Sequence, residues 1–187
     1  MDQYKSWVIG TVIKPAETFR DINEKNPIGL AFVTYLVVSM LSNFALMLFD
    51  SDKAGITGAL QSVKESFGSI ITVLIFGTLL HFIARLFSGG QGRFWNFCSC
   101  YLFAIIPLIF TVVLVPFFSL FGLTGLFAGS VTTMMLIAWT LVLDVIAIRE
   151  SYSLTTLSSV LVMVIAIVII IVIVFLFALL YVGLISR

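Results

Sequence analysis

Long uncharged stretches rich in apolar residues alternate with short polar segments along the chain. No Asp, Glu, Lys or Arg occurs between Lys25 and Asp50, or between Glu65 and Arg85. An α-helix rises about 1.5 Å per residue, so about 20 apolar residues cross a bilayer core of about 30 Å. These two stretches therefore predict one membrane-spanning helix each, over residues 28–49 and 67–87.

The uncharged stretch between Arg93 and Asp144 is too long for a single span. As one helix, its roughly 50 residues would be about 75 Å long. Pro, Gly and Ser cluster in PFFSLFGLTG, residues 116–125, and predict a turn there between spans 94–116 and 125–148. The last stretch, after Glu150, is long enough for one span, 155–185, and too short for two. Pro107 lies in the middle of the third span and predicts a kink.

The pattern predicts an all-α polytopic membrane protein: a bundle of five transmembrane helices in one membrane domain, residues 28–187. Residues 1–27 form a separate N-terminal segment without the features of a cleavable signal peptide. From Pro15 this segment is amphipathic, because Ala16, Phe19 and Ile22 share one helical face while Glu17, Asp21 and Glu24 lie opposite. We expect a short interfacial helix that either has a role of its own or merely leads into the first span.

Composition supports a membrane protein and excludes several other classes. Hydrophobic residues make up 61% of the chain and charged residues 10%, against about 45–50% and about 25% in soluble domains. A net charge of +1 gives no basis for nucleic-acid binding. Cys98 and Cys100 point to opposite sides of a helix, and the chain has one histidine. We therefore expect no metal, no cofactor and no enzymatic activity.

The distribution of Lys and Arg predicts the orientation in the membrane. Cytoplasmic loops carry an excess of these residues. One side of the predicted topology has Lys5, Lys14, Arg20, Lys25, Arg85, Arg93 and Arg149, and the other side has Lys53, Lys64 and Arg187. We therefore expect the N-terminus in the cytoplasm and the C-terminus outside.

Four polar side chains, His81, Arg85, Asn96 and Asp144, fall at similar depth in the predicted cytoplasmic half of the bundle. Charged groups inside a bilayer are costly and need a partner or a function. We expect Asp144 to pair with Arg85 or His81. This intramembrane polar cluster is either a proton- or ion-sensitive site or a structural pair that fixes the helix register.

A glycine-rich loop joins the second and third predicted spans. It contains Gly89, Gly90 and Gly92, with Arg93 after it. Such a loop with flanking arginines suits an anion such as a lipid headgroup. A tight turn between two helices explains the same residues.

The segments W…KPAETFRDI…NPIG and HFIARLFSGGQGRFWNFCSCYLFAIIP, residues 81–107, resemble the Yip domain family of Ypt/Rab-interacting membrane proteins. The resemblance implies five spans, a cytoplasmic N-terminus and a non-enzymatic role in membrane organisation. Small-GTPase binding does not carry over, because residues 1–27 lack the Asp-Leu-Tyr-Gly-Pro motif of the eukaryotic members. The compact form is similar to prokaryotic members and implies a plasma-membrane location.

Two functions are consistent with this sequence. The first is a membrane organiser or adaptor that works through contacts with the lipid bilayer, with further copies of itself or with a membrane-protein partner. The alternative is a small ion- or proton-coupled transporter or channel that uses the polar cluster. A water-filled cavity around that cluster would favour transport, whereas a closed pair would favour a structural role.

Overall fold

The computed structural model describes residues 2–47 and 56–185, and nearly all of them are helical. Within these ranges, five stretches are long and apolar enough to cross a membrane. They are α3 (Ile28–Met47), α4 (Ile56–Phe87), the broken helix α5 to α6 (Phe94–Ser119), α7 (Gly122–Tyr152) and α8 (Thr156–Ile185). The predicted all-α bundle of five membrane helices is therefore confirmed. Residues 48–49 of the predicted first span, and the predicted outer-side residues Lys53 and Arg187, lie outside the described residues.

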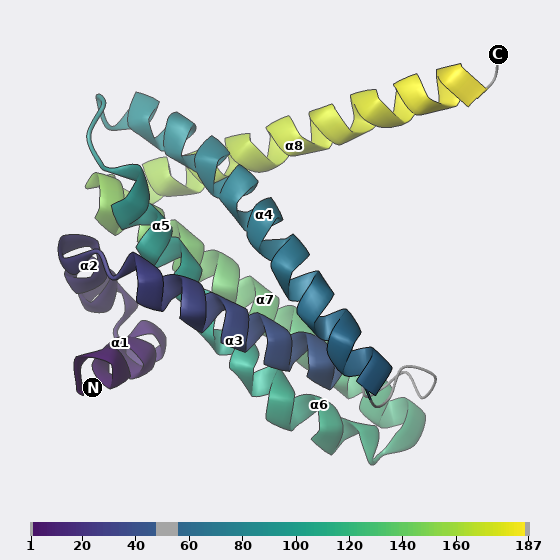
Figure 1. Cartoon of the computed structure of the whole chain (residues 1–187). Helices are drawn as coiled ribbons and strands as arrows, with labels where there is room; N and C mark the ends of the chain where they lie inside the picture. The colour runs from purple at the N-terminus through teal and green to yellow at the C-terminus, as the bar shows by residue number, and fades with distance from the viewer. Residues whose placement is uncertain (1, 48–55, 186–187) are drawn as a thin grey trace.

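The first four membrane helices pack side by side and alternate in direction (Figure 1). α3 starts at the end of the bundle that carries α2 (Pro15–Lys25), and α4 returns to that end. α4 is longer than the span predicted from residue 67, because it begins at Ile56, and its first part packs through the small residues Gly58, Ser62 and Ser66. We call the end of the bundle with α2 the N-terminal end.

The interior combines apolar packing with a line of hydroxyl groups. Buried apolar side chains of α2, α3, α5 and α7 belong to one core cluster, and those of α4, α5, α7 and α8 belong to a second. Between α3 and α4, Ser39 Oγ donates to Ser66 Oγ at 3.1 Å, and Asn43 Nδ2 donates to Ser66 Oγ at 3.2 Å. Such bonds between small polar residues let membrane helices approach closely.

The third membrane helix is broken where Pro107 occurs, as predicted. α5 (Phe94–Phe103) ends before the 3-10 segment η2 (Ile106–Phe110), and α6 (Thr111–Ser119) continues the span. Proline lacks the N–H that an α-helix needs, so the regular bonding pattern stops there. The turn to α7 is shorter than residues 116–125, since Pro116 lies inside α6 and α7 begins at Gly122.

Two short helices precede the membrane domain. α1 (Asp2–Ile13) was not predicted, and α2 begins at Pro15 as expected. Phe19 and Ile22 of α2 are fully buried, because this face packs against α5 and α7. The apolar face of α2 is therefore covered by protein rather than by lipid.

The last helix leaves the bundle. α8 packs against α4 and α7 only through its first half, where Val162, Met163 and Ala166 are buried. Its second half extends away from the other helices towards the C-terminus (Figure 1). Every side chain from residue 171 to residue 182 is exposed.

Candidate functional site

His81 lies in the interior at the N-terminal end of the bundle, between α4, α5 and α7. Its Nδ1 is hydrogen-bonded to the hydroxyl of Tyr152, the last residue of α7. The ring of Phe94 packs edge-on against the imidazole, with the centroids 5.4 Å apart. His81 therefore has a partner from another helix, and that partner is a tyrosine rather than Asp144.

Arg85 follows His81 by one turn but points away from the interior. It is exposed and lines a shallow groove with Phe82, Leu86, Gly89 and Gly90. No ion pair joins Arg85 to an acidic residue within the described ranges. The structure thus separates Arg85 from Asp144.

The loop after α4 is a tight turn built on glycines. Gly89, Gly90 and Gly92 all have positive φ values, which glycine adopts without strain. Gly92 lies against the ring of Tyr152, leaving no room for a larger residue. Gly89 has no neighbour within 4 Å of where a side chain would begin, and Arg93 is exposed. Gly92 therefore has a packing role, whereas Gly89 and Gly90 form part of the groove at Arg85.

Asn96 belongs to a set of contacts that hold α2 on α5. Its Nδ2 donates to the carbonyl of Asn23 at 2.6 Å, and Ser99 Oγ donates to Asn26 Oδ1 at 2.9 Å. The thiol of Cys100 lies 3.3 Å from the carbonyl oxygen of Phe19. Asn96 is therefore a positioning residue for the N-terminal segment and lies apart from Asp144.

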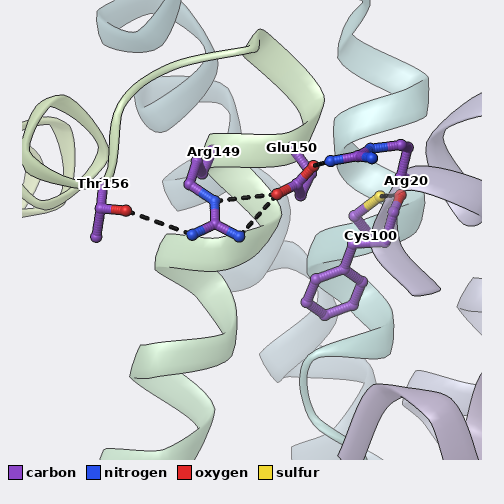
Figure 2. Close-up of polar contacts among 6 residues, drawn as sticks. Arg20, Cys100, Arg149, Glu150 and Thr156 are labelled. Carbon is purple, nitrogen blue, oxygen red and sulfur yellow. Dashed lines mark hydrogen bonds and ion pairs between the residues drawn. The ribbon is translucent and has the colours of Figure 1, made fainter. Parts of the chain in front are cut away.

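An ion-pair network fastens α2 to α7 beside these contacts (Figure 2). Glu150 accepts from Arg20 Nη2 at 3.0 Å and from Arg149 Nη2 at 2.8 Å. Arg149 also donates to Thr156 Oγ1 at 3.3 Å, which ties the start of α8 to the same network. The side chain of Glu150 is 9% exposed, so a nearly buried carboxylate links α2 to α7, and Arg149 extends the network to α8.

Asp144 lies deeper along α7, in a different environment. The predicted pair with Arg85 or His81 is wrong: among the described residues, no hydrogen bond or ion pair involves the Asp144 carboxylate. The reason is the level along α7: Tyr152, which is bonded to His81, lies eight residues after Asp144, or about 12 Å further along the helix. The four residues predicted as a cluster occupy four separate places.

A cavity of about 180 Å³ lies beside Asp144. Its walls come from α3, α4, α5, η2 and α7, namely Tyr35, Val73, Tyr101, Ile105, Leu108, Thr140 and Asp144. Tyr35 donates its hydroxyl proton to Ser69 Oγ at 3.1 Å, and Thr140 donates to the carbonyl of Leu136 at 3.0 Å. The cavity therefore lies where four membrane helices meet and the third one is broken.

The two tyrosines at this cavity were not predicted as site residues. Tyr101 lies in the segment 81–107 that resembles the Yip domain family, but neither tyrosine is charged or titrates near neutral pH, so neither stood out as a candidate. The sequence pattern indicates no contact for Glu150, which only marks the start of the last uncharged stretch. Its buried position becomes evident only when α2 is placed against α7.

The chain resembles one known protein family along nearly its whole length. A model of the Yip1 domain matches residues 9–179, nearly the whole chain. The chain belongs to the Yip1 family. The Yip1 match begins within α1 and ends in α8, so it includes the N-terminal helices as well as the five membrane helices. No curated protein and no solved structure gives a significant match. With its five apolar helices, this Yip1 family member is an integral multi-pass membrane protein.

Proposed function

We propose that this Yip1 family protein is a non-enzymatic membrane organiser or adaptor that binds another membrane protein through α8. Family membership supports a role outside catalysis. We place the protein in the plasma membrane of a prokaryote, with α1 and α2 on the cytoplasmic side, because Lys and Arg concentrate at that end.

The observation that carries the proposal is the free second half of α8. Residues 171–182, IVIVFLFALLYV, are apolar and exposed on every side of the helix. The first half of α8 is held by α4 and α7, so the second half has a fixed base from which it extends. A membrane helix segment that none of the described residues covers offers its surface for packing with a helix of another protein.

Photo-crosslinking along α8 tests this proposal. A photoreactive residue is placed singly at each position from 171 to 182, and native membranes are irradiated. A partner helix gives protein adducts at positions three or four residues apart, because such positions share one face. Ile71 and Ile75, which are exposed on α4, are the matched control sites. Adducts with lipid alone, or equal protein adducts at all positions and at the controls, would contradict the proposal.

The adaptor role also includes contact with lipid headgroups. Arg85 is exposed beside Gly89 and Gly90, with Phe82 and Leu86 lining the same groove. A cation above apolar side chains at the end of a membrane helix suits an anionic lipid. Replacing Arg85 with Gln should reduce the anionic lipid that co-purifies with the protein, as measured by mass spectrometry. Unchanged lipid content would remove this part of the proposal.

One observation favours the alternative of an ion- or proton-coupled transporter. Asp144 faces a cavity rather than a closed ion pair. Acidic residues within membrane segments often mark ion pathways. Reconstitution into liposomes tests this alternative, which requires that Asp144→Asn abolish a proton or cation flux seen with the wild type.

A further inference from the structure

Asp144 combines deep burial with a side chain that no described residue neutralises. Its exposed fraction is 6%, and it lines the cavity between α3, α4, α5 and α7. Burying a carboxylate without a hydrogen bond or an opposite charge is unfavourable. Such a group is either protonated or completed by a ligand that supplies the missing hydrogen bonds and charge.

The polar atoms around the cavity are mostly hydrogen-bond acceptors. The hydroxyl protons of Tyr35 and Thr140 are used by Ser69 and by the Leu136 carbonyl, respectively. Each hydroxyl oxygen therefore still has a lone pair to offer, and the Asp144 carboxylate adds two oxygens. Tyr101 contributes a hydroxyl that has no hydrogen-bond partner among the described residues. The cavity therefore suits a ligand that donates several hydrogen bonds.

The third membrane helix is broken beside the site. α5 ends at Phe103, and Ile105 just beyond that end lines the cavity. Discontinuous membrane helices occur at the ion sites of known transporters.

We propose that this cavity binds a small primary ammonium group, with Asp144 as its counter-ion. An ammonium group has three N–H donors and no acceptor, which matches the acceptors around it. The faces of Tyr35 and Tyr101 can add a favourable contact with the cation. Val73 and Leu108 provide apolar surface for the attached carbon atoms. Binding at equilibrium does not require transport, so the proposal is independent of both functions above.

The size of the cavity limits the ligand. A volume of about 180 Å³ equals roughly six water molecules at about 30 Å³ each. A small free amine fits this space, and so does the ethanolamine headgroup of a lipid whose tails stay outside. Both sources present the same ammonium group, and the experiment separates them.

Binding is measured as a shift in thermal stability of the full-length protein in detergent. A ligand that binds only the folded state raises the melting temperature in a saturable way. We expect methylammonium and ethanolamine to do so. Tetramethylammonium, which lacks N–H donors, and sodium or potassium at equal concentration should not.

Two variants and one matched control assign the effect to the cavity. Asp144→Asn should weaken amine binding by about tenfold or more, because a charged hydrogen bond is replaced by a neutral one. Tyr101→Phe removes one hydroxyl and should weaken amine binding several-fold. This variant tests the cavity even if Asp144→Asn does not fold. Glu65→Gln also converts a carboxylate to an amide, but at an exposed site on α4. This control should bind amines like the wild type.

Melting temperatures in nanodiscs made with phosphatidylethanolamine or with phosphatidylglycerol distinguish a lipid headgroup from a soluble amine as the source of the ammonium group. A lipid ligand predicts that phosphatidylethanolamine alone stabilises the wild type and that Asp144→Asn loses the difference. Stabilisation by free amines in both lipids points to a soluble ligand. The proposal is overturned if no amine shifts the melting temperature in a saturable way, if alkali-metal ions act equally well, or if every folded cavity variant retains the wild-type shift.

Discussion

Three glycines in the loop between α4 and α5 have positive φ values, but their surroundings differ. Gly89 is surrounded by open space, whereas Gly92 lies against the ring of Tyr152 and near the carbonyl oxygen of Ser151. Tyr152 in turn bonds His81. The loop glycine that contacts the bundle is thus linked to the only histidine of the chain.

Replacing these glycines with alanine separates backbone strain from packing. Both Gly89→Ala and Gly92→Ala introduce a side chain at positive φ, which costs about 1 kcal/mol. Gly92→Ala should cost about 1–3 kcal/mol more, because its methyl group overlaps the Tyr152 ring. Thermal unfolding of the two variants in the same detergent measures this difference. Equal losses of stability would show that Tyr152 moves aside freely.

Asp21 gives the N-terminal segment a dependence on pH. Hydrogen bonds from Lys25 and from the Trp7 indole hold the pKa of Asp21 below its usual value of 3.8. A lowered pKa in the folded state means that Asp21 stabilises the fold above about pH 4. This contribution is lost as the pH falls through the folded pKa.

The fluorescence of Trp7 reports this change in a variant with Trp95→Phe and Trp139→Phe. We expect the Trp7 emission to shift as the pH is lowered from about 5 to about 2, because protonated Asp21 releases the indole N–H. Adding Asp21→Asn to the same background should remove the pH dependence. An identical acid transition in that variant would assign it to another group.

At the level of whole helices, the lengths of the uncharged apolar stretches predicted most of the fold. The break at Pro107 and the helix from Pro15 were also predicted, because proline acts through local backbone geometry. α1 was missed, since its apolar run is short and only two of its residues, Trp7 and Thr11, are buried, which are one helical turn apart. Its burial depends on α2 and on Phe103 of α5, which sequence periodicity does not reveal.

The docking of α2 can be followed through Cys100. This thiol is fully buried beneath the Phe19 carbonyl, so it reacts with a maleimide only when α2 moves away. In a Cys98→Ala background, Glu150→Gln and Arg20→Gln should each raise the labelling rate several-fold. Both variants break the ion pair between α2 and α7, in which Arg20 is exposed and Glu150 is nearly buried.

Lys14→Gln is the matched control for this experiment. It removes an exposed ion pair between Lys14 and Glu17, both near the start of α2, and leaves the contact with α7 intact. Labelling of Cys100 should not change in this variant. If Glu150→Gln also leaves the rate unchanged, then the hydrogen bonds from Asn96 and Ser99 hold α2 by themselves.

Across the whole molecule, the charge bias predicts a testable orientation. Ile56 at the start of α4 is exposed, and Gly89 lies at the other end of the same helix. In a chain without native cysteines, Ile56→Cys should react with an impermeant maleimide in intact cells. Gly89→Cys should react only after permeabilisation. The reverse pattern would place α1 and α2 outside the cell.

The candidate site was harder to predict than the fold for a physical reason. The uncharged stretches predict similar depth for His81, Arg85, Asn96 and Asp144, but they fix neither the level of one helix against another nor the direction of each side chain. Tyr152, about 12 Å beyond Asp144 along α7, reaches His81. Asn96 bonds the Asn23 carbonyl, and Asp144 lines the cavity with Tyr35 and Tyr101.

The ion pair between Arg20 and Glu150 also orders events during biosynthesis. The two residues are 130 positions apart in the chain. At a synthesis rate of about 5–20 residues per second, the ribosome needs about 6 to 26 seconds to make the intervening segment. The face of α2 with Phe19 and Ile22 can therefore be covered completely only after α7 has followed three earlier membrane helices. The segment that is made first is among the last to reach its final position.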